Sequence, residues 1–240
     1  MPTRFTNDPG QNVEPLWAPD GSSIVFTGQR NGVWGLYRKP SNLVGGEKLL
    51  YKSHHGQPAY GTSWSRDGRY VLFQEQPDGV FALPMDEASG ERKPIEVVPG
   101  EFNPRGARFL PDPHPLYVSY TSRVSGQDEI YVQTFDPNPA SSPKPRPEQV
   151  SIGGGGSMRW REDGKRLFYM ASANGDMMTV DVTYSPTFHF EVPKRLFPHP
   201  ASRGWEMTGK GERFLISIAL SPSASAPYTV VLNWTALLKK

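Results

Sequence analysis

The chain has 240 residues, with 24 glycines, 25 prolines, no cysteine and a formal charge of +2 at pH 7 that is spread along its length. The lack of cysteine excludes disulfides, zinc–thiolate sites and thiol nucleophiles, and the absence of a basic block gives no indication of nucleic-acid binding. No apolar run is long enough for a transmembrane helix, so membrane insertion of this segment is not expected. High glycine and proline content favours many short strands joined by turns.

A short pattern recurs along the chain and predicts the same element each time. It consists of an aromatic residue, a tight Asp-Gly turn and an alternating apolar strand, and its copies span 16–26, 63–73 and 159–169. Asp-Gly supplies the positive φ angles that two-residue hairpin turns need, so each copy predicts a β-hairpin. The aromatic anchors are Trp17, Trp64 and Trp160, which we expect to be buried between neighbouring sheets.

Two weaker copies of the hairpin have their anchors at Phe109 and Met207. An apolar residue lies seven positions after each anchor, namely Ile24, Val71, Leu116, Leu167 and Phe214. In the copy at Phe109 the proline-rich segment 111–115 replaces the Asp-Gly turn, and we expect the strand register to survive this change.

Further strands are predicted after each hairpin. Third strands are expected at 33–37, 80–83, 129–135, 177–182 and 228–234, and fourth strands at 48–51, 95–98, 149–152 and 195–197. Four antiparallel strands in about 40 to 50 residues are typical of a β-propeller blade. Blades are therefore predicted at about 14–52, 60–98, 105–152, 157–197 and 204–234.

The two ends of the chain are predicted to close the ring. The fifth unit has no fourth strand of its own, whereas 3–6 reads as a strand with no hairpin partner. Pairing 3–6 with 228–232 would remove an exposed edge and place Phe5 on the fifth blade. The predicted fold is thus all-β: one five-bladed β-propeller domain over 1–240, made of four-stranded antiparallel blades and closed by the N-terminal strand. A monomer is expected.

The hairpin sequences point to a known class of repeat. The copies that run Trp-Ala-Pro-Asp-Gly from Trp17 and Trp-Ser-Arg-Asp-Gly from Trp64 resemble the TolB-like propeller repeats of bacteria. The segments 4–10, 129–133 and 228–234 are similar to the C-terminal propeller region of bacterial serine/threonine protein kinases and related sensors. This resemblance implies a sensory module, extracytoplasmic if it follows a membrane-anchored kinase and cytoplasmic otherwise. It does not imply kinase activity, because the kinase motifs are missing.

Motifs for catalysis and metal binding are sparse. No Gly-x-Ser-x-Gly nucleophile elbow occurs. The histidines do not show the i, i+4 pairing of helical zinc sites, and the adjacent His54 and His55 are interpreted as solvated loop residues. Carboxylate pairs such as Asp128-Glu129 and Glu162-Asp163 could serve a glycosidase if two carboxylates faced each other across about 5 to 10 Å. No catalytic residue, cofactor or metal site is assigned.

The position just before each anchor is the most informative polar position. These residues are Leu16, Ser63, Arg108, Arg159 and Glu206. Because a charge without a partner is costly to bury, two arginines and a glutamate on successive blades predict an ionic network along the central channel. The network has two interpretations: a structural salt-bridge cluster, or a site for an anionic or polar ligand at one channel mouth, which Glu14, Arg105, Ser157 and Trp205 would complete.

The sequence therefore favours a non-catalytic β-propeller that binds a protein partner or a small polar or anionic ligand. The resemblance places it as the sensory or interaction module of a bacterial signalling protein. The alternative is a carbohydrate-active or other hydrolase with its site at the channel mouth.

Overall fold

The computed structural model describes residues 3–86, 92–114, 116–138, 145–184, 187–198 and 202–218. These residues form antiparallel sheets in which the strands follow one another in chain order. The first sheet contains β1 (Asn12–Trp17), β2 (Ser23–Arg30), β3 (Val33–Pro40) and β4 (Lys48–Lys52). The second contains β5 (Tyr60–Trp64), β6 (Tyr70–Glu75), β7 (Gly79–Pro84) and β8 (Ile95–Pro99). A 3-10 turn, η1 (Gly100–Phe102), leads into the third sheet.

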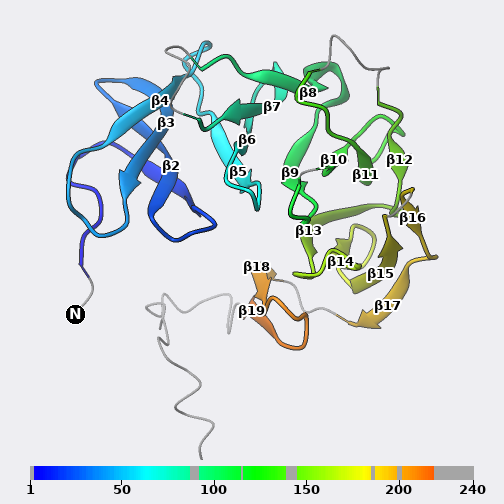
Figure 1. The fold of residues 1–240 in the computed structure, drawn as a ribbon. Coiled ribbons are helices and arrows are strands. Elements are labelled where there is room, and N and C mark those ends of the chain that lie inside the picture. The colour runs from blue at the N-terminus through cyan, green and yellow to red at the C-terminus, as the bar shows by residue number, and fades with distance from the viewer. Residues whose placement is uncertain are drawn as a thin grey trace, which may run out of the picture.

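The third sheet contains β9 (Arg105–Phe109), β10 (Tyr117–Ser122), β11 (Glu129–Thr134) and β12 (Glu148–Gln149). The fourth contains β13 (Gly155–Trp160), β14 (Arg166–Ala171) and β15 (Met177–Thr183), and both β16 (His189–Phe190) and β17 (Lys194–Phe197) pair with β15. The fifth contains β18 (Ser202–Met207) and β19 (Phe214–Ile218). Figure 1 shows the sheets arranged around a central axis, with β5, β9, β13 and β18 nearest to it. Three of the described sheets thus have the predicted four antiparallel strands, whereas the fourth has five and the fifth is described for two strands only.

The hydrophobic core lies between successive sheets. One cluster, which includes Val25 and Phe73, joins the first sheet to the second. Similar clusters join the second to the third, the third to the fourth and the fourth to the fifth. Each sheet therefore buries its faces against its neighbours in the chain, as expected for repeats that stack. None of the described helices is long and apolar enough to cross a membrane.

The predicted hairpin register is correct at four anchors and wrong at one. Trp17, Trp64, Trp160 and Met207 each pair with the residue seven positions later. Phe109 instead pairs with Val118, and Leu116 is half-exposed. The proline-rich connection adds two residues to the turn. A shift of two keeps every side chain of β10 on its proper face, because side chains alternate with a period of two.

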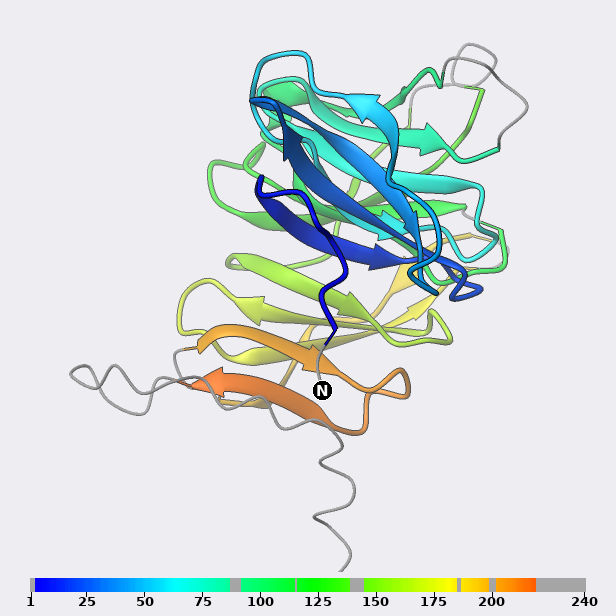
Figure 2. The same ribbon diagram turned by 90° about the vertical axis from the view of Figure 1, so that its left-hand side faces the viewer.

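The predicted closure by residues 3–6 is not observed. These residues form no strand, and Phe5 packs edge-on against Phe26 of β2, with ring centroids 6.3 Å apart. Lys39 donates from Nζ to the Phe5 carbonyl oxygen at 2.6 Å. In Figure 2 this dark-blue segment crosses in front of β1. The expectation that Phe5 packs on the fifth blade is therefore wrong, while the proposed partner strand at 228–232 lies outside the described residues.

A local cause explains this packing. Phe26, Ile24 and Tyr37 form a buried apolar cluster on the face of the first sheet that points away from the second. Phe5 reaches this face through a short connection, which costs less chain entropy than pairing with a strand at the far end of the chain. The described sheets do not form a closed ring, and the number of blades and the limits of the domain remain predictions.

The three tryptophan anchors differ in burial. Trp160 is 9% exposed and donates from Nε1 to Ser119 Oγ of the third sheet at 2.9 Å. Trp64 is half-buried against the first sheet, where Arg38 lies over its ring. Trp17 is 61% exposed, so the prediction of burial is wrong for it. Trp64 and Trp160 each pack on the preceding sheet, and within the described ranges no sheet precedes the first.

Candidate functional site

Each innermost strand contains a β-bulge just before its anchor. The register shifts fall between Val13 and Leu16, Gly61 and Ser63, Arg105 and Arg108, Gly156 and Arg159, and Ser202 and Gly204. Glu14 and Ser157 have φ angles of 51° and 50°, in the left-handed region that side chains other than glycine rarely adopt. Bulges re-aim side chains and are common beside functional sites. The sequence reasoning missed them, although a glycine recurs three residues before the anchor at Gly61, Gly106 and Gly204.

Arg108 on β9 lies near the axis, and no described residue forms an ion pair with it. Within the described part of the chain, its guanidinium makes no hydrogen bond or ion pair, and the residue is half-buried. The pKa of Arg108 is lowered to about 10, mainly by burial and then by the charge of Arg159, while Glu206 and Glu14 act in the opposite direction. These influences come from the first, fourth and fifth sheets. The four side chains are therefore close enough to interact electrostatically around the axis.

Arg159 and Glu206 form an ion pair between the fourth and fifth sheets. Arg159 donates to Glu206 Oε1 from Nη2 at 2.6 Å and from Nε at 2.8 Å. Its guanidinium also lies over the ring of the buried Trp205, 5.5 Å from the centroid. Of the three charges that the sequence placed before the anchors, two thus neutralise each other. Arg108, the third of these charges, takes no part in this ion pair.

The remaining predicted residues have three different environments. Leu16 packs into the core between the first two sheets, and Ser63 Oγ accepts a hydrogen bond from the Phe109 N–H at 3.2 Å. Arg105 does not join Arg108, because it pairs with Asp128, as Arg123 does too. Glu14 and Ser157 are exposed at their bulges.

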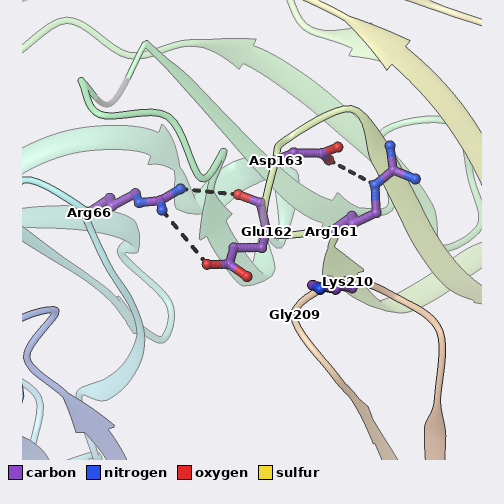
Figure 3. Close-up of a pocket in the computed structure, with 6 residues that line it drawn as sticks. All are labelled: Arg66, Arg161, Glu162, Asp163, Gly209 and Lys210. Atoms are coloured by element: carbon purple, nitrogen blue, oxygen red, sulfur yellow. Dashed lines mark hydrogen bonds and ion pairs between the residues drawn. The ribbon is translucent and has the colours of Figure 1, made fainter.

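A hollow of about 530 Å³ lies beside the Asp-Gly turns, at the end of the innermost strands that is opposite to the bulges (Figure 3). It is lined by Arg66, Arg161, Glu162, Asp163, Gly209 and Lys210. Arg66 reaches from the second sheet to the fourth: its Nη1 donates to the Glu162 carbonyl at 3.2 Å, and its Nη2 lies 3.8 Å from the carboxylate. Lys210 has no hydrogen-bond or ion-pair partner among the residues that the structure describes. Cations therefore outnumber carboxylates around the hollow.

A repeat position that the sequence reasoning overlooked builds this hollow. The second residue after each anchor is Pro19, Arg66, Pro111, Glu162 and Gly209. Arg66 Nη1 also donates to the Pro111 carbonyl at 3.4 Å, and the Glu162 N–H donates to the Gly209 carbonyl at 2.7 Å. Residues from four of these five positions thus contact one another. Their shared position in the repeat is the sequence signal that could have predicted these contacts.

The carboxylate pairs named for a hydrolase are committed to other contacts. Arg161 donates to Asp163 at 2.8 Å and holds the pKa of that carboxyl below its ordinary value. Asp128 is paired with two arginines, and Glu129 accepts from Ser151 Oγ and from the Gly154 N–H. A glycosidase needs a carboxylic acid whose pKa is raised. The lowered pKa of Asp163 is the opposite of what that acid requires.

The comparisons with known proteins identify the fold. No protein-family model and no curated protein matches the sequence. TolB from Acinetobacter baumannii has a TM-score of 0.64 at 17% identity, covering 88% of this chain and 49% of its own. An oligogalacturonate lyase has a TM-score of 0.59 at 14% identity, covering 87% and 59%. The periplasmic gluconolactonase of Pseudomonas aeruginosa has a TM-score of 0.55 at 16% identity, covering 84% and 63%.

The chain spans about half the length of the TolB structure and less than two thirds of the other two. At these identities the likeness concerns the fold alone, and the three names cover different activities. Together with antiparallel sheets set around a common axis, the comparisons show that this chain has a β-propeller fold.

Proposed function

We propose that this β-propeller is a non-catalytic binding module, the sensory or interaction part of a bacterial signalling protein. In this proposal Arg108 holds an acidic group of a protein partner or of a small ligand. The observation that carries it is the half-buried guanidinium of Arg108, which has no partner within the described ranges.

The chemistry of arginine supports an acidic ligand. The guanidinium presents its donors in a planar fork that matches a carboxylate or a phosphate, and hydrogen bonds between charged groups are among the stronger ones. Partial burial lowers the local dielectric and strengthens them further. Because Glu206 already neutralises Arg159, the attraction is concentrated at Arg108.

The route of approach follows from the two ends of the innermost strands. At the end with the hairpin turns, Arg66 bridges from the second sheet to the fourth. The other end carries the bulges, with the exposed Glu14 and Ser157. We expect the ligand to enter from the bulged end, where no such bridge between distant sheets is found among the described side chains.

Calorimetric titration at low salt tests the proposal. The probes are inorganic tripolyphosphate, an acidic oligosaccharide and a glutamate-rich peptide. We expect saturable binding of at least one probe by the parent chain and its loss in Arg108→Met. The stability of this variant should stay equal or rise slightly, because methionine fills a similar volume without a buried charge.

Arg123→Met is the matched control, since Arg123 is an exposed arginine of the same sheet that pairs with Asp128. It should bind as the parent does. Three results would refute the proposal: no binding of any probe by the parent, equal losses in the two variants, or marked unfolding of Arg108→Met, which would assign Arg108 a structural role.

A further inference from the structure

A second polar cluster lies where the first sheet passes into the second. The connection between β4 and β5 carries His54 and His55, and the turn between β6 and β7 carries Asp78, next to Glu75 at the end of β6. One ring nitrogen of His54 and one carboxylate oxygen each from Glu75 and Asp78 lie within 4.8 Å of one another. His55 Nε2 lies 2.8 Å from Asp78 Oδ2. Four groups with metal-ligand chemistry thus come together from two loops.

Glu75 is the unusual member of this cluster. It is fully buried, and within the described residues no cation pairs with it. Its Oε2 accepts from the Tyr51 hydroxyl at 2.5 Å, and its Oε1 accepts from the His54 N–H at 2.7 Å. The Tyr51 hydroxyl is the donor in the first of these hydrogen bonds, so it carries its proton there. Two neutral donors do not replace the counter-charge that a buried carboxylate requires.

A bound cation would supply the missing charge. A carboxylate has about four lone-pair sites, of which Glu75 uses two in the hydrogen bonds above. These hydrogen bonds also hold the carboxylate in one orientation, as outer-shell partners do in metal sites. His54 is exposed, and its ring contacts that of Tyr51, with centroids 5.4 Å apart.

We propose that His54, Glu75 and Asp78 bind a divalent transition-metal ion of the Zn²⁺ or Mn²⁺ class, with His55 orienting Asp78. Imidazole together with carboxylates suits these ions, whereas Ca²⁺ and Mg²⁺ prefer oxygen ligands alone. Such an ion would tie the β4–β5 connection to the β6–β7 turn. The site is separate from Arg108, and its test does not depend on the proposed function.

Titration of the chelator-treated full chain with ZnCl₂, MnCl₂ and CaCl₂ tests the site. We expect one saturable site for Zn²⁺ or Mn²⁺, a rise in melting temperature on binding, and much weaker binding of Ca²⁺. His54→Ala and Asp78→Asn should each weaken binding more than about ten-fold, as losses within metal sites commonly do. His54→Ala keeps the backbone N–H that donates a hydrogen bond to Glu75, so the fold of the loop should survive.

His114→Ala is the control, because His114 is exposed in a loop of the third sheet. Its binding should equal that of the parent. X-ray absorption on the zinc-loaded parent gives a reading that needs no variant, and imidazole and oxygen scatterers together are expected. The proposal is overturned by the absence of a saturable site, by equal losses in the control, by unchanged binding in His54→Ala and Asp78→Asn, or by a spectrum without imidazole.

Discussion

The indole of Trp160 shows what an anchor contributes when a neighbouring sheet is present. It is buried, and its Nε1 finds a hydrogen-bond acceptor in Ser119 of the preceding sheet. Trp17 occupies the same repeat position on the first sheet but is 61% exposed. Identical residues at equivalent positions therefore differ in energy because of what lies opposite them.

This difference predicts unequal costs of truncation. Trp160→Ala should lower the free energy of unfolding by about 3–5 kcal/mol, the usual range for a large buried aromatic residue. Trp17→Ala should cost much less, within about 1 kcal/mol, because little of its surface leaves water on folding. Urea unfolding of both variants measures the two values. Equal costs would mean that Trp17 is covered in solution.

At the scale of the element, the Asp-Gly turns share a capping device. Asp20, Asp67 and Asp163 each accept the backbone N–H two residues later, at 2.9, 3.0 and 3.0 Å. This is the Asx-turn geometry that makes aspartate favourable here. The pKa of each of these carboxyls lies below its ordinary value. The ionised form therefore stabilises the turn.

The sign of the resulting pH dependence follows from this lowering. Burial acts to raise the pKa of Asp67, but hydrogen bonds from Ser65 and Arg69 lower it more. A depressed folded-state pKa gives stability that is fully present above the unfolded value and lost as the pH falls through the folded value. Melting temperatures measured below pH 4 should therefore fall less steeply for Asp67→Asn than for the parent. Parallel curves would contradict this assignment.

At the scale of the whole molecule, the described sheets form an open array. Four core clusters join neighbours along the chain, whereas Phe5 covers the outer cluster of the first sheet. Stability in such an array is close to a sum of contacts between neighbours. On its outer face the first sheet thus depends on Phe5, whereas the second, third and fourth sheets each pack against a described sheet on both sides.

Removing the Phe5 ring from the outer cluster should change the stability of the protein measurably. Phe5→Ala should lower the free energy of unfolding by about 1–2 kcal/mol, since a partly buried ring is lost. Arg4→Ala, a change of an exposed neighbour, is the control and should have little effect. Chemical denaturation of both variants gives the comparison. A Phe5→Ala variant as stable as the control would show that the ring does not pack on Phe26 in solution.

The local sequence specifies the hairpins, their anchors and most of their register, because Asp-Gly turns and alternating apolar residues act over fewer than about ten positions. The propeller follows from the repetition of this unit. The same reasoning failed where the turn chemistry changed, as at 111–115, and where a neighbour was assumed, as for Trp17 and Phe5.

Contacts between sheets decide which of the candidate site residues meet. The sequence places Arg108, Arg159 and Glu206 at one repeat position. Only the folded arrangement shows that Arg159 pairs with Glu206 and that Arg108 stays outside this ion pair. In the same way His54 meets Glu75 and Asp78 only once the two loops are folded together. Such partners are distant in sequence, and which side chains meet depends on how the sheets pack, which no local pattern encodes.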